Sequence, residues 1–259
     1  MTTDQGPSER EGYYLYGIVP AGAPGSFGPI GVRGGEEVFA IPWKDLAAVV
    51  SRHPVRVPTP EPEKLMAHAR ALEEIMKRTT VIPVKFGVVF DSQRTLLRLL
   101  QQNATELKEI LAMVAGRIEL GLKVAWRKET LQEIFAEMAS SDPEVMAWKQ
   151  EAEKTNGNGL QIALSLGELV QNKLAKKAEE LRAELLAPLQ RLAVATRRNE
   201  TRMERMILNE AFLVDRDREA EFDRAVEELV AEYEDRLEFK YTGPWPPYSF
   251  AILKVERVD

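Results

Sequence analysis

The stretch Arg117–Arg127, RIELGLKVAWR, decides how the chain is divided. Apolar and other residues alternate along it, which is typical of a β-strand with one buried face. It follows a long helical pattern and opens the more regular half of the sequence. We therefore expect an N-terminal α+β domain over residues 13–115 and a second domain over residues 116–259.

The second domain has the element order β-α-β-β-α-β. Helical sequence follows the first strand, with Asp142–Pro143 as a cap and N1 proline inside it, a break at TNGNG near residue 157, and an end near Pro188. The later elements are expected at Leu189–Arg198, Met206–Val214 (strands), Glu219–Glu234 (helix), Leu237–Tyr241 and Tyr248–Val255 (strands). This order predicts a modified ferredoxin-like domain with an enlarged helical first crossover.

The first domain has the expected element order β-β-β-α-β-α. Residues 1–12 are polar and predict a disordered arm. TTVIPVKFGVVFD alternates cleanly and predicts one strand, near an edge because of Pro83. Other elements are expected as strands at Tyr13–Pro20, Glu37–Pro42 and Leu46–Ser51, a helix from Thr59 or Glu61, and a long helix capped by Asp91–Ser92.

Composition restricts the compartment and the class of partner. The 259 residues include no cysteine, which excludes disulfides and thiolate chemistry. The N-terminal sequence has no apolar segment of a signal peptide, and no apolar run approaches the length of a membrane span, so we expect a cytoplasmic protein. The net charge of −6 is opposite to that of a general nucleic-acid binder.

No catalytic pattern is recognisable in the sequence. The two histidines are His53, in a proline-rich loop, and His68, on the apolar stripe of a helix where a core-boundary role is expected. Zinc-binding histidine spacings, a G-x-S-x-G turn and a P-loop are all missing. We therefore expect no enzyme, no metal and no cofactor.

The most distinctive segment is YTGPWPPYSF at residues 241–250. Its prolines and glycine predict an extended path carrying large aromatic side chains. These either pack back on their own domain or form a platform for a partner. The candidate partner-facing or domain-locking residues are Trp245, Pro246, Pro247, Tyr248 and Phe250. A second candidate surface is Arg197, Arg198 and Arg202, with a solvated hairpin loop as the alternative.

Five strings resemble the GvpF/GvpL family of gas vesicle accessory proteins, and they lie in the family's order over residues 13–255. TGPWPPYSF is the most specific of them. The strings are YYLYGIVP, TTVIPVKFGVVFDS, ELGLKVAW, NEAFLVDR and YTGPWPPYSFAIL. The resemblance implies an N-terminal α+β domain followed by a modified ferredoxin-like domain.

The resemblance also implies a function and partners. Family members are minor components or assembly factors of gas vesicles, and the expected partners are the hydrophobic shell protein GvpA and other accessory gas vesicle proteins. A shell subunit needs a wide apolar surface, which makes it an aggregation hazard before assembly. The alternative is an RNA- or small-ligand-binding ferredoxin-like protein, although the K/R-G-F/Y-G/A-F pattern of RNA-binding domains is missing.

Overall fold

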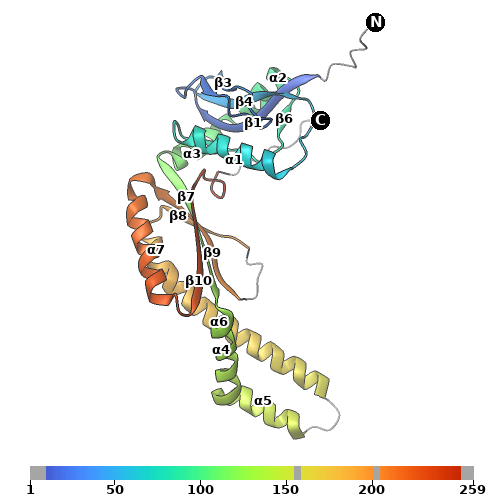
Figure 1. The fold of residues 1–259 in the computed structure, drawn as a ribbon, viewed down its shortest axis with the longest axis vertical. Helices are drawn as coiled ribbons and strands as arrows, with labels where there is room; N and C mark the ends of the chain where they lie inside the picture. The colour runs from blue at the N-terminus through green and yellow to red at the C-terminus, as the bar shows by residue number, and fades with distance from the viewer. Residues whose placement is uncertain (1–9, 155–158, 201–204, 252–259) are drawn as a thin grey trace. The chain divides into compact units, whose positions relative to one another are not determined.

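The computed structural model describes residues 10–154, 159–200 and 205–251, and these form two compact units (Figure 1). The first unit extends to Glu119 and continues from Gly243 onward, and the second comprises Leu120–Thr242. Both contain helices and a sheet, so the α+β class is confirmed. The domain boundaries expected from the sequence remain a proposal, and Gly243–Ala251 groups with the N-terminal unit.

The first unit is organised around β1 (Glu11–Pro20), which pairs antiparallel with β4 (Leu46–Pro54). Residues 12–19 of β1 are all buried. Because successive side chains of a strand point to opposite faces, both faces of the sheet are covered here. The other strands of this sheet are β2 (Ser26–Gly28), β3 (Val38–Trp43), β5 (Ile82–Pro83) and β6 (Val89–Phe90). The strand order is β2-β3-β4-β1-β5, and β6 also pairs with β1.

Three helices pack against this sheet: α1 (Pro62–Met76), α2 (Gln93–Gln102) and α3 (Ala104–Val114). Pro62 occupies the first turn of α1, where its missing N–H has no partner to lose. Ser92 caps α2, because its hydroxyl accepts the Thr95 N–H at 3.3 Å. Leu72 and Ile75 of α1 join Tyr14 and Tyr16 in the core.

The expected single strand at residues 79–91 is wrong, because only β5 and β6 form there. Pro83 offers no N–H to continue the ladder, and Gly87 has φ +94°, outside the extended region. The segment still follows β1, since Val84 N–H donates to Tyr16 C=O at 2.8 Å and Leu15 N–H donates to Val88 C=O at 2.9 Å.

Two other expectations for this unit also need correction. His53 lies in β4 and is 4% exposed, so it is a core residue and not part of a proline-rich loop. The long helix after Ser92 is two helices, which meet at Asn103. The Asn103 side chain donates to Leu99 C=O at 2.9 Å, which terminates the first helix locally.

His68 is held in one neutral form inside the core. Its Nε2 lies 3.0 Å from the Val84 carbonyl oxygen, which can only accept, so Nε2 carries the proton. Its Nδ1 then accepts from the Tyr14 hydroxyl at 2.8 Å, and Tyr14 in turn accepts the Gly87 N–H at 3.2 Å. Burial lowers the pKa of His68 to about 4.

The free energy of unfolding of the first unit should therefore decrease as the pH falls below the pKa that His68 has in the unfolded chain. The unfolded chain binds the proton near pH 6.5 and the folded chain only near 4, so stability is lost on acidification between these values. We expect a loss of about 2 kcal/mol from pH 7 to pH 5, measured by urea unfolding. In the His68→Gln variant, the free energy of unfolding should change less with pH over this range. A pH dependence as strong as that of the parent protein would contradict the conclusion that His68 is neutral in the folded state.

The second unit has a four-stranded sheet of order β10-β7-β9-β8. Its strands are β7 (Arg117–Trp126), β8 (Ala195–Arg198), β9 (Met206–Asp215) and β10 (Leu237–Trp245). Its helices are α4 (Lys128–Ser141), α5 (Pro143–Lys154), α6 (Gly159–Gln190), the short 3₁₀ helix η1 (Arg216–Arg218) and α7 (Glu219–Tyr233). The elements follow the β-α-β-β-α-β order, while the ferredoxin-like assignment stays a prediction.

The turn between α4 and α5 is built as the sequence predicts. The Asp142 carboxylate accepts the backbone N–H groups of Glu144 and Val145, both at 3.1 Å. Pro143 starts α5 at the position where a proline is tolerated. Lys173 of α6 lies 3.0 Å from both Asp142 and Glu144, which ties this turn to the long helix.

The end of α6 differs from the expectation. The helix continues through Pro188 to Gln190, so residue 189 belongs to a helix and β8 begins only at Ala195. Leu185, Leu186 and Leu189 are buried on this last turn. Their packing outweighs the single backbone hydrogen bond that Pro188 cannot donate. Of the predicted TNGNG break, residues 155–158 lie outside the described residues, and its last glycine, Gly159, begins α6.

A buried ion pair joins α6 to the sheet of this unit. The Glu210 side chain on β9 is 1% exposed and accepts from Arg182 Nη2 at 2.6 Å and Nε at 3.2 Å. Arg182 also lies 2.9 Å from Glu179 on its own helix. The pair fixes which side of α6 faces the sheet.

Glu210→Gln should destabilise the protein by about 2 kcal/mol, because it removes the buried one of the two carboxylates that pair with Arg182 and leaves only the exposed Glu179 as counter-ion. Chemical denaturation monitored by circular dichroism measures this difference. The matched control is Glu221→Gln, which removes an exposed carboxylate 2.9 Å from Arg218 and should have no measurable effect. Equal effects of the two substitutions would show that burial of the pair is unimportant.

Candidate functional site

The C-terminal aromatic segment, Trp245–Phe250, forms a compact turn at the end of β10. Gly243 has φ +127°, a conformation that favours glycine, and the Gly243–Pro244 peptide bond is cis. Pro246 and Pro247 are buried. Backbone N–H groups of Tyr248 and Phe250 donate to the carbonyls of Pro246 (2.7 Å) and Pro247 (3.1 Å). The expected strand Tyr248–Val255 is therefore wrong over Tyr248–Phe250.

Glu119 anchors this turn within the first unit. Its carboxylate is buried and accepts the Ser249 backbone N–H at 2.6 Å and the Ser249 hydroxyl at 2.7 Å. Charge-assisted hydrogen bonds of this kind are stronger than neutral ones. The alternation of the strand Arg117–Arg127 did not indicate this role, because a Glu at a polar position is usually solvated.

The aromatic side chains divide between packing and exposure. Trp245 is 38% exposed and Tyr248 is 37% exposed, while Phe250 is half-buried. Burial of its hydroxyl end, with smaller contributions from Glu73 and Glu119, raises the pKa of Tyr248 to about 12. Tyr248 therefore remains an uncharged hydrogen-bond donor at neutral pH. The segment presents two amphipathic rings on a backbone that the prolines and Glu119 hold in place.

The predicted arginine surface lies in the other unit. Arg197 and Arg198 are exposed on β8, opposite Ala211 and Glu210 of β9, so they belong to a strand and not to a loop. Arg198 lies 3.5 Å from Glu179 of α6. Arg202 lies outside the described residues. The structure thus places the aromatic and arginine candidates in different units.

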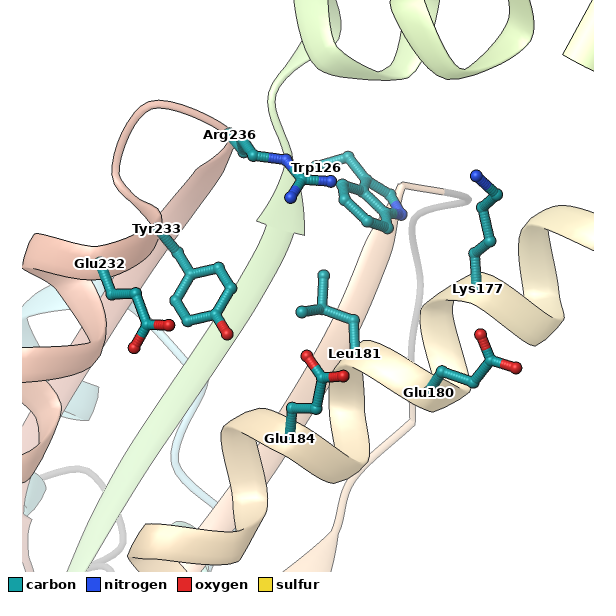
Figure 2. A pocket seen from close by; sticks show the side chains of 8 residues that line it. All are labelled: Trp126, Lys177, Glu180, Leu181, Glu184, Glu232, Tyr233 and Arg236. Atoms are coloured by element: carbon teal, nitrogen blue, oxygen red, sulfur yellow. The ribbon is translucent and has the colours of Figure 1, made fainter. Parts of the chain in front are cut away.

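A pocket in the second unit was not indicated by the sequence. It is lined by residues of β7, α6 and α7 and the turn before β10, including Trp126, Leu181 and Tyr233 (Figure 2). These residues are more than fifty positions apart along the chain, and each fits an ordinary amphipathic pattern. Only the tertiary structure brings them together.

The described residues contain no group of three or more histidine, aspartate or glutamate side chains placed to hold a metal ion. The histidines serve the core of the first unit: His68 bonds to Tyr14 and Val84, and His53 Nδ1 lies 2.7 Å from the Pro54 carbonyl oxygen. Among the described helices, none is both long and apolar enough to cross a membrane.

Comparison with known proteins gives consistent matches along almost the whole chain. The family model "Gas vesicle synthesis protein GvpL/GvpF" matches residues 12–252. Gas vesicle protein F1 of Halobacterium salinarum is 29% identical, with 95% of each chain covered. The crystal structure of gas vesicle protein GvpF from Anabaena sp. PCC7120 is 26% identical, has a TM-score of 0.81, and is matched over 95% of this chain and 100% of that one.

These relatives define the chain as a gas vesicle accessory protein. A crystal structure of GvpF from Microcystis aeruginosa matches with a TM-score of 0.82 at 25% identity, covering 93% of this chain and 99% of that one. The chain belongs to the GvpL/GvpF family, as the sequence resemblance indicated.

Glu119→Ala should loosen the C-terminal aromatic segment. The substitution removes the acceptor of the Ser249 N–H and hydroxyl, and an unsatisfied polar group costs about 1–3 kcal/mol. We expect faster hydrogen exchange at the Ser249 amide, measured by NMR. Ser249→Ala keeps the backbone bond and should change that exchange less. Unchanged exchange in Glu119→Ala would show that the two bonds do not hold the segment.

Proposed function

We propose that this protein is a minor component or assembly factor of gas vesicles that binds the shell protein GvpA and limits its aggregation during nucleation. The observation that carries the proposal is the aromatic segment, in which Trp245 and Tyr248 are 38% and 37% exposed on an anchored turn. Family membership over residues 12–252 supports the gas vesicle context.

The physical basis is the complementarity between this segment and an apolar shell subunit. Trp and Tyr bury large areas at protein interfaces and lose little side-chain freedom when they do so. A backbone already fixed by buried prolines reduces the entropy cost of binding. Further exposed apolar side chains, on helices of the second unit, are Phe135, Met146 and Leu164.

Binding without catalysis is sufficient for this role. A protein that binds only the unassembled subunit stabilises it by mass action, to an extent that rises with the logarithm of the binder's free concentration once this exceeds the Kd. We therefore propose a stoichiometric binder and not an enzyme, acting in the cytoplasm and at the vesicle. Other accessory gas vesicle proteins are proposed as further partners.

Light scattering of GvpA on dilution from denaturant tests this function. Equimolar protein should suppress the scattering, and the two proteins should co-elute from a sizing column. A double variant, Trp245→Ala with Tyr248→Ala, should lose most of the suppression because it removes the exposed rings.

The matched control is Trp43→Ala, which deletes a half-buried tryptophan at the end of β3 in the same unit. It should suppress scattering like the parent protein. Failure of the parent to suppress scattering or to co-elute would remove GvpA as the direct partner. Equal activity of the parent and the double variant would remove the aromatic segment as the contact.

A further inference from the structure

A pocket of about 440 Å³ opens in the second unit between α6 and α7, beside the end of β7 (Figure 2). Trp126 and Leu181, which line it, are only 3% and 8% exposed, and Tyr233 is half-buried. Volumes of about 300–1,000 Å³ are usual for ligand sites. The pocket thus has room for a long side chain, with Trp126 and Leu181 at its covered base and charged side chains making up most of its accessible lining.

Charged side chains surround this interior: Lys177, Glu180, Glu184, Glu232 and Arg236. Two of them already have partners elsewhere, since Glu180 lies 3.9 Å from Lys176 and Lys177 lies 3.7 Å from Glu137. Within the described part of the chain, Glu184 and Glu232 form no ion pair. Arg236, whose guanidinium lies beside Trp126 in Figure 2, is the remaining lining cation, so the three glutamates outnumber the two cations and the lining has a net negative charge.

The surroundings of Tyr233 agree with this charge balance. Burial raises its pKa, and the carboxylates of Glu232 and Glu184 raise it further, while Arg236 acts in the opposite direction. The negative groups thus contribute more than Arg236 at the phenol. In Figure 2, Glu184 on α6 and Glu232 on α7 lie on either side of the Tyr233 ring.

We propose that this pocket binds a lysine or arginine side chain presented by a protein partner. The aliphatic stem would lie against the accessible part of the Tyr233 ring, above Leu181 and Trp126 at the base, and the cationic head would reach Glu184 and Glu232. Long cationic side chains bury their stems on apolar surface in this way, and aromatic faces and carboxylates both stabilise the head. An anionic ligand is disfavoured because it would meet two carboxylates that form no ion pair, one of which, Glu232, is hydrogen-bonded to the Tyr233 hydroxyl.

The inference deepens the proposed function and rests on it. An apolar surface alone would bind any hydrophobic chain, whereas a charge-selective pocket gives register and specificity. The partner segment is therefore expected to carry a basic residue flanked by apolar ones.

The experiment uses the full-length protein and short peptides, with the indole N–H signal of Trp126 followed by two-dimensional NMR. The chain has four tryptophans, and the Trp126 signal is assigned from its loss in Trp126→Phe. Acetyl-Leu-Arg-Leu-amide should shift this signal in a saturable manner. Acetyl-Leu-Glu-Leu-amide should not. A shift with the acidic peptide alone, or with neither peptide, would overturn the proposal.

Glu184→Gln combined with Glu232→Gln should weaken binding of the arginine peptide about tenfold, because it removes both charged acceptors. The matched control is Glu227→Gln, an exposed site on α7. It is five residues from Glu232 and so about 140° around the helix. Unchanged affinity in the double variant would overturn the proposed contacts.

The peptide titration does not depend on GvpA, so the two proposals fail separately. Arginine-peptide binding without suppression of GvpA scattering would remove the proposed function and leave the pocket. Suppression of scattering without peptide binding would do the reverse.

Discussion

The buried ion pair between Arg182 and Glu210 is the interaction on which the second unit depends. It joins the long helix α6 to β9, and the Glu210 side chain is 1% exposed. A buried charge must keep its partner, so the helix cannot rotate about its axis without a large cost. Leu181 and Glu184 are neighbours of Arg182 along α6, and the pair therefore fixes the direction in which both face the pocket.

Glu119 has the corresponding role for the C-terminal aromatic segment, Trp245–Phe250, in the first unit. It lies on β7 and binds Ser249 through two short hydrogen bonds. In both units a carboxylate on a strand holds a segment that is distant in sequence. The surfaces proposed for partners lie next to these anchors, which gives them the fixed geometry that binding requires.

The two proposed surfaces differ in how selectively they would bind a partner. The aromatic segment contributes apolar contact area through Trp245 and Tyr248, and such contacts select little among partner sequences. The pocket between α6 and α7, in the role proposed for it, selects a cationic side chain through Glu184 and Glu232. An accessory protein that handles an aggregation-prone subunit benefits from both, because apolar contact supplies affinity and charge supplies orientation.

The sequence by itself determined most elements and the family. Periodicity and capping gave β1, β9, α7 and the Asp142 turn, because these depend on neighbours along the chain. It also singled out Trp245 and Tyr248. The tertiary structure alone decided how the segment at residues 79–91 pairs with β1 as β5 and β6, that α6 continues past Pro188, and that residues of β7, α6 and α7 enclose a pocket. The break at residues 79–91 has local causes in Pro83 and Gly87, but how the two pieces pair with β1 was visible only in the structure. The other two features depend on packing between distant segments, which outweighs local preference when it buries leucines or pairs a charge.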